Sequence, residues 1–265
     1  YAWLSRSTAG GGRIAPLLPA KADSAGKRLL LAFALAVLLL FCALPLTAVL
    51  VQAAQAGGSW QVLWEEETRL AAWNTLRFTA TAVAAALALG ISHAALARRL
   101  PWIRGITFLP FMVSPVCVAF GILLLYPEWT ASLPLLTATY ALLAYPFVTK
   151  DLLAAWDALP PQYATAARSM GANRFQTACY VTAPLLLPAM RRGLTLAAAT
   201  CIGEFAATLF LSRPEWLTLT TLIYQYLGTA GAENHDRAMV LTAALMMLAA
   251  AVFVLLDAAE REKAV

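Results

Sequence analysis

Six long apolar stretches restrict what this sequence can fold into. A helix needs about 20 apolar residues to cross a bilayer. Because lipid offers no partners for backbone polar groups, a spanning segment of this kind must be a helix. The sequence therefore predicts an all-α, polytopic membrane protein with six transmembrane helices. The predicted spans are Leu29–Ala54, Leu76–Ala97, Ile106–Tyr126, Leu133–Val148, Leu194–Leu211 and Ala238–Leu256.

The basic residues predict how these spans are oriented. Apolar residues make up 61% of the chain and charged residues only 12%, which excludes an ordinary soluble domain. Cytoplasmic loops of membrane proteins carry an excess of Lys and Arg. If both termini are cytoplasmic, all but four of the 19 basic residues lie inside, the exceptions being Arg69, Arg77, Arg213 and Arg237. The net charge of +5 is explained by this topology, so no nucleic-acid partner is predicted.

Three regions are predicted along the chain. Residues 1–28 are rich in Gly, Ala, Pro and basic residues, which is typical of a cytoplasmic linker. Residues 29–256 form the membrane domain, and residues 257–265 a charged cytoplasmic tail. The apolar start Tyr1–Leu4 fits the end of a preceding span. We therefore expect the chain to be the rear half of a longer, fused polypeptide.

A polar loop at 150–193 interrupts the membrane domain. Pro160 and Pro161 suit a helix start, where the missing N–H is not needed. Gly171 is free to adopt a positive φ and end that helix, and Asn173 is a suitable N-cap for the next. Pro184 is expected to stop or kink the second helix. Two interpretations remain open: a docking surface for a partner outside the membrane, or a connector on the lipid headgroups.

Two features inside the spans indicate a pathway or a gate. Pro110 and Pro115 both lie in the third span, and two prolines so close together break the hydrogen-bond ladder of a helix. Glu204, in the fifth span, lies between Gly203 and Phe205. A buried carboxylate in a membrane is costly and is expected to face the bundle interior or a water-filled cavity. The alternatives are a simple kink at the prolines and a structural hydrogen bond between helices at Glu204.

The sequence lacks the usual catalytic and nucleotide-binding motifs. It contains no GxxxxGK[ST] phosphate loop, no GxSxG and no HExxH. Its four cysteines are scattered singly, with no pair at zinc-ligand spacing, and are predicted to be small buried apolar residues. We expect no catalytic residues, no metal and no cofactor, and any energy source to reside on another subunit.

The polar loop resembles the coupling loop of ABC-importer permeases, known as the EAA loop. The family pattern is Glu-Ala-Ala, three residues, Gly, nine residues, Ile-x-Leu-Pro. Its spacing is kept here, although Thr165 replaces the Glu and Ala183 the Leu, so a salt bridge made by the family's Glu cannot be transferred. The matching coupling-loop residues are Thr165, Ala166, Ala167, Gly171, Val181 and Pro184.

The resemblance extends over nearly the whole chain from Leu29, and is nearest to the thiamine and ferric-iron permeases, which are often fused double permeases. Gly203–Leu209 and Thr221–Gly228 look thiamine-like, which favours thiamine, with ferric iron close behind and an anion such as molybdate lower. The resemblance implies a type I importer permease fold in a bacterial inner membrane and transport by alternating access.

The same resemblance implies the partners of the chain. They are a cytoplasmic ATPase dimer that binds ATP and receives the loop, a second permease half, and a periplasmic or lipoprotein substrate receptor. Two rival hypotheses follow from the residues. One is a secondary transporter in which Glu204 couples transport to protons. The other is a membrane-embedded enzyme, for which the sequence provides no set of catalytic residues.

Overall fold

The computed structural model describes residues 25–129 and 132–261, and all regular elements in these ranges are helical. The first half contains α2 (Ala25–Gln55), η1 (Gly57–Trp64), α3 (Glu66–Arg99), η2 (Pro101–Ile106), α4 (Leu109–Met112), α5 (Pro115–Leu125), η3 (Pro127–Trp129) and α6 (Leu133–Ala158). The second half contains α7 (Gln162–Ser169), α8 (Arg174–Thr177), the π turn η4 (Ala178–Thr182), α9 (Ala183–Ile202), α10 (Ala206–Leu211), η5 (Pro214–Trp216), α11 (Leu219–Gly228) and α12 (Ala232–Arg261).

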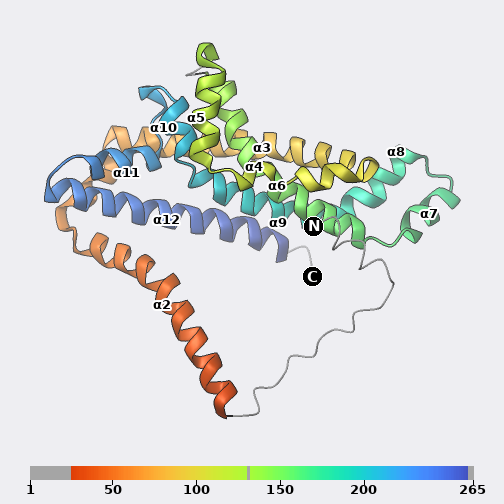
Figure 1. Cartoon of the computed structure of the whole chain (residues 1–265), viewed down its shortest axis with the longest axis horizontal. Coiled ribbons are helices and arrows are strands. Elements are labelled where there is room, and N and C mark those ends of the chain that lie inside the picture. Colours follow the sequence, from red (N-terminus) through yellow and green to blue (C-terminus); the bar gives the residue numbers. More distant parts are fainter. Residues whose placement is uncertain (1–24, 130–131, 262–265) are drawn as a thin grey trace.

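Long helices form the body of the molecule. In Figure 1, α3, α6, α9 and α12 run alongside one another, with α7 and α8 beyond one end and α11 at the other. Helices α5 and α10 pack together and project from the side of this bundle, while α2 diverges from it. The bundle thus has two distinct ends, which we name the α7 end and the α11 end.

The centre of the bundle is packed through small residues. The buried face of α3 is lined by alanines, which let α6 approach closely, as expected where helices associate without a hydrophobic driving force. Gly90 of α3 and Gly193 of α9 both face Val148 of α6. A Cβ at Gly193 would lie 2.7 Å from the Val148 Cα, and one at Gly90 2.8 Å from the Val148 Cβ. Both glycines are therefore required by the close approach of their helices to α6.

A second apolar cluster joins the elements at the α11 end. It contains Ala53 from the end of α2, Val62 from η1, Leu222 from α11 and Val240 from α12, all buried. Ala53 is the only buried residue of α2, which leaves the apolar surface of that helix exposed over most of its length. Such a surface suits a helix surrounded by lipid.

The predicted all-helical membrane fold is confirmed, whereas the count of six spans is not. Within the described ranges, four helices are long and apolar enough to cross a membrane: Ala25–Gln55, Glu66–Arg99, Arg174–Ile202 and Ala232–Leu256. The bent pair Pro101–Met112 and Pro115–Leu125 would make a fifth. Helix α6, which contains the predicted fourth span, is not among them. Its residues pack mainly against α3 and α9, so they do not need the apolar composition of a lipid-facing helix.

The observed helix limits differ from the expected ones at four places. Helix α6 continues to Ala158, and one helix of 29 residues runs from Arg174 to Ile202, so the connecting segment is shorter than the predicted loop 150–193. Pro184 does not stop that helix, because the π turn directly before it accommodates the ring.

The fifth span is not continuous to Leu211 but breaks after Ile202. Helix α12 extends to Arg261, into the expected tail, and most of the expected linker 1–28 lies outside the described residues.

Candidate functional site

The segment from α7 to the end of η4, residues 162–182, forms a sharp elbow at Gly171, which has φ = 90°. The N–H of Gly171 donates to the Arg168 carbonyl at 3.0 Å, and the N–H of Ala172 donates to the Ala167 carbonyl at 3.1 Å. These two bonds form a Schellman motif, which uses a left-handed residue to satisfy the last carbonyls of a helix. The predicted role of Gly171 as a helix terminator is therefore observed.

Asn173 starts the second arm of the elbow with a capping box. Its Oδ1 accepts from the Gln176 N–H at 2.8 Å, and its own N–H donates to Gln176 Oε1 at 2.9 Å. Both bonds satisfy donors that a helix start leaves without partners. Because these bonds are local, the elbow is shaped by its own sequence rather than by the bundle.

The elbow exposes large apolar side chains. They are Tyr163, Met170, Phe175 and Tyr180. Of the residues that match the coupling-loop pattern, Ala167 is buried and Val181 partly buried, whereas Thr165, Ala166, Gly171 and Pro184 are exposed. Thr165 donates its hydroxyl to the Pro161 carbonyl at 3.1 Å, a bond within its own helix. An exposed group of apolar side chains at one end of a membrane protein is typical of an interaction surface.

The two predicted prolines flank the first break in a span. Pro110 lies in the first turn of α4 and Pro115 in that of α5, and the two arms meet at 94°. Val113 and Ser114 between them have extended ψ angles of 139° and 133°. Proline restricts the residue before it to extended backbone, which explains Ser114. The residues of this break, 113–115, are all exposed.

Glu204 lies at a second break, between α9 and α10, and is 8% exposed. Its Oε1 accepts from the Ala207 N–H at 3.1 Å, so the side chain caps α10. Its backbone carbonyl accepts from the Tyr140 hydroxyl at 3.2 Å and the Thr220 hydroxyl at 3.0 Å. Gly203 is exposed and Phe205 packs on the Tyr224 ring at 5.1 Å. The carboxylate of Glu204 therefore makes a local bond to the start of α10, and its backbone carbonyl makes the bonds to other helices; the predicted role in a pathway or gate stays a prediction.

Hydroxyl groups from neighbouring helices form a buried hydrogen-bond network around this second break. The Thr208 hydroxyl lies 3.2 Å from that of Tyr140 and 3.5 Å from that of Thr218. At the start of α11, the Leu219 N–H donates to Thr75 Oγ1 at 3.0 Å. Sequence analysis did not identify these residues, because the partners come from α3, α6, α10 and α11 and no single stretch contains them.

Asn74 of α3 is a further buried residue that sequence analysis missed. It is fully buried, and its amide donates to the carbonyls of Glu215 and Leu217 at 3.0 and 2.8 Å. These bonds hold the turn between α10 and α11 against α3. An amide in the first half of an apolar helix is itself a signal that a polar partner lies nearby.

The two breaks lie on neighbouring helices. Helix α5 follows the first break and helix α10 the second, and the two helices pack side by side. The ring centroids of Phe120 and Phe210 lie 5.8 Å apart between them. The elbow lies apart from both, beyond the α7 end of the bundle. The predicted coupling residues and the predicted gate residues are therefore two separate groups.

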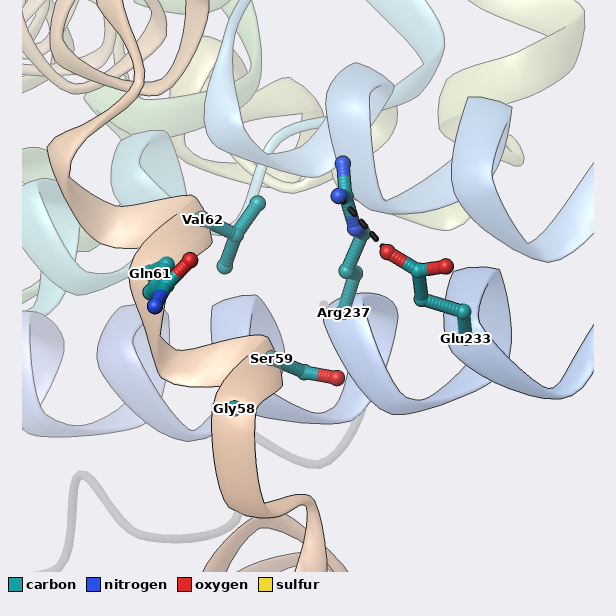
Figure 2. A pocket seen from close by; sticks show the side chains of 6 residues that line it. All are labelled: Gly58, Ser59, Gln61, Val62, Glu233 and Arg237. Atoms are coloured by element: carbon teal, nitrogen blue, oxygen red, sulfur yellow. Dashed lines mark hydrogen bonds and ion pairs between the residues drawn. The ribbon is translucent and has the colours of Figure 1, made fainter.

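A cavity of about 320 Å³ opens at the α11 end, between η1 and the start of α12. In Figure 2, Ser59 and the pair formed by Arg237 and Glu233 border this space. Arg237 contacts Glu233 at 2.8 Å and Glu65 at 3.2 Å, so its charge is already compensated. Among the described residues, no group of three His, Cys, Asp or Glu side chains is arranged to hold a metal ion.

Known proteins similar to this chain are membrane permeases. The sulfate transport system permease protein of Escherichia coli (strain K12) is 28% identical over 237 residues, which cover 77% of this chain and 83% of that protein. The molybdenum transport system permease protein of Haemophilus influenzae is 27% identical over 164 residues, covering 55% of this chain and 72% of that protein.

Solved structures share the fold. A chain of a bacterial alginate ABC transporter, crystallised with an alginate pentasaccharide-bound periplasmic protein, superimposes with a TM-score of 0.70 at 19% identity and covers 89% of this chain and 95% of its own length. Residues 86–259, well over half of the sequence, match the model of one protein family. The chain therefore belongs to the binding-protein-dependent transport system inner membrane components, the permease subunits of ABC importers, which are not enzymes.

Proposed function

We propose that this chain forms one half of the substrate pathway of its importer and that the elbow at Gly171 is where a cytoplasmic ATPase docks. The observation that carries the proposal is the elbow itself: two short helical arms, locally fixed, with Met170 and Phe175 exposed beyond the end of the bundle. Because its own hydrogen bonds fix its shape, the elbow can be pushed by a partner without being deformed. The ATPase dimer, and not this chain, would bind ATP.

The distribution of charge supports a cytoplasmic α7 end. Arg98 and Arg99 end α3, and Arg104 of η2 forms an ion pair with Asp157 near the end of α6, just before the elbow. Arg168 and Arg174 lie on the elbow. Since basic residues concentrate on the cytoplasmic side, both chain termini would lie there as well. The α11 end would then receive substrate from a periplasmic or lipoprotein receptor.

A second permease half completes the proposed pathway, either on the same polypeptide or as a separate chain. One bundle with two neighbouring breaks provides only one wall of a pathway. The elbow of each half would then meet one subunit of the ATPase dimer.

A small oxyanion is the first substrate class to test. The relatives described above are named for sulfate and molybdenum transport, and neither is named for thiamine or iron. Thiamine remains the second candidate, because Gly203–Leu209 and Thr221–Gly228 resemble thiamine permeases; ferric iron shares only the general resemblance. Uptake of labelled sulfate, molybdate, thiamine and ferric iron in cells lacking this locus, with and without the gene, distinguishes the candidates.

Proton-coupled transport through Glu204 is less well supported by the geometry. The carboxylate caps α10, and this bond gives it a role that does not require proton transfer. A secondary transporter would accumulate substrate in vesicles under a pH gradient alone. The proposed importer would do so only with ATP, its ATPase and its receptor.

Substitution of Gly171 with alanine tests the docking role. A side chain at φ = 90° costs about 1–2 kcal/mol, although no neighbouring atom lies within 4 Å to clash with it. We expect Gly171→Ala to insert normally but to lower uptake and the copurification of the ATPase. Gly228→Ala is the matched control, since it also meets open space but has an ordinary φ. Normal uptake and copurification in Gly171→Ala would show that the elbow is not the docking element.

A further inference from the structure

The last turn of α6, directly before the elbow, is fastened to the end of α3 and to η2. Arg104 of η2 contacts Asp157 of α6 through two bonds, Nη1 to Oδ2 at 2.6 Å and Nη2 to Oδ1 at 3.0 Å. Such a bidentate pair fixes the relative orientation of both side chains as well as their distance. Arg104 Nε also donates to the Ala97 carbonyl at 3.4 Å, which ties η2 back to α3.

A second contact reinforces the first on the adjacent residue of α6. The Arg98 guanidinium lies 4.5 Å from the centre of the Trp156 ring, within the range of a cation–π interaction. The Leu159 N–H donates to the Trp156 carbonyl at 3.3 Å and closes the helix before Pro160. Two consecutive residues, Trp156 and Asp157, are thus held by two arginines of a neighbouring segment. We call these four residues the arginine clamp.

The position of the clamp connects two parts of the molecule that otherwise lie apart. On one side, Asp157 is five residues from the start of α7. On the other, η2 leads directly into α4 and the break at 113–115. Further along the bundle, Gly90 and Val148 hold α3 and α6 in close contact. The clamp is therefore the contact through which a displacement of the elbow would reach η2.

The bidentate geometry fixes the orientation of η2 relative to α6 more than it stabilises the fold. The Arg104 and Asp157 side chains are 41% and 48% exposed, so solvent screens their attraction. We infer that the arginine clamp transmits the ATPase-driven movement of the elbow to the broken span α4–α5. Arg104 and Asp157 are then positioning residues for transport. This inference rests on the docking role proposed above.

The test measures substrate uptake and ATP hydrolysis in the same vesicles, made from the intact transporter with its ATPase and receptor. Substitutions in a contact network that links two sites change the coupling between those sites by roughly 2- to 30-fold. We expect Arg104→Asp and Asp157→Arg each to lower the number of substrates imported per ATP within that range. The double variant with the charges exchanged should recover most of the loss. Arg99→Ala, at an exposed neighbouring arginine, should leave the ratio unchanged.

Two controls separate this inference from the docking proposal. Asp157→Asn keeps the shape of the side chain, so a loss of coupling without loss of protein yield supports the clamp even if a charge reversal fails to fold. An unchanged ratio in Asp157→Asn and both reversals overturns the inference, as does an exchanged pair no better than the single variants. If the ATPase does not copurify with the unaltered chain, the docking proposal itself fails.

Discussion

The two broken spans of this permease are built in different ways. The break between α4 and α5 is exposed, is flanked by two prolines and bends by 94°. The break between α9 and α10 is capped by the buried Glu204 and bonded to hydroxyl groups of α6 and α11. The first is therefore shaped by local backbone restriction, and the second by partners distant in sequence.

This difference indicates which break is free to move. A break held by buried hydrogen bonds from several helices resists a change of shape, because moving it leaves polar groups without partners. A break made by proline has one backbone N–H donor fewer to satisfy at each proline. We therefore expect α9–α10 to be the fixed element and α4–α5 the moving one during transport. Three substitutions test this comparison.

Removing the Glu204 carboxylate should have the largest effect. Glu204→Ala leaves the Ala207 N–H unsatisfied in a buried site, a cost of about 1–3 kcal/mol. We expect lower thermal stability of the purified protein in detergent and reduced uptake. Glu204→Gln keeps an acceptor oxygen and should retain most of both. If Glu204→Gln abolishes uptake while stability is normal, the carboxylate acts through its charge and the second break is not merely structural.

Removing the Tyr140 hydroxyl should have an intermediate effect. The hydroxyl donates to the Glu204 carbonyl, and hydrogen bonds between membrane helices average about 0.6 kcal/mol, with a maximum near 1.7 kcal/mol. Tyr140→Phe should lower the melting temperature by less than Glu204→Ala does. Tyr180→Phe, at an exposed tyrosine, serves as the control. Equal melting temperatures for Tyr140→Phe and the parent would contradict a break held by its neighbours.

Relaxing the proline break should have the smallest effect on stability. Pro115→Ala removes a restriction on the unfolded chain and on Ser114, for a change of about 0.4–1 kcal/mol or less. We expect a broader distribution of distances between spin labels placed on α4 and α5, with stability close to the parent. A large loss of stability with an unchanged distribution would mean that α4–α5 is the fixed break.

Local chemistry made part of this structure predictable from sequence. Gly171 and Asn173 act through their own backbone conformation or near neighbours, so their roles as a helix end and a helix start could be read directly from the chain. Pro110 and Pro115 also restrict the backbone locally, so the break between them could be predicted. The family resemblance of the loop depended on the same local spacing. In these cases the partners lie within a few positions along the chain, and sequence analysis was sufficient.

Most of the remaining features depend on contacts between distant segments. The bonds from Asn74 to the 215–217 turn join residues about 140 positions apart, and no pattern in a single sequence specifies them. The helix is continuous at Pro184 because a π turn precedes the proline, and residue propensities do not predict such a turn. Helix α6 packs between α3 and α9 and is not among the helices apolar enough to count as spans, so the number of spans stays a prediction.

The most direct test of the account is the partner of the elbow in the assembled transporter. A photo-crosslinking amino acid is placed at Met170, which directly follows α7, or, as control, at Trp64, which ends η1 in the cluster at the α11 end; both side chains are 82% exposed. After illumination of cells producing the whole transporter, we expect the ATPase subunit to be crosslinked from position 170 and not from position 64. Crosslinking of the ATPase from position 64, or none from position 170, would contradict the docking of the ATPase at the elbow.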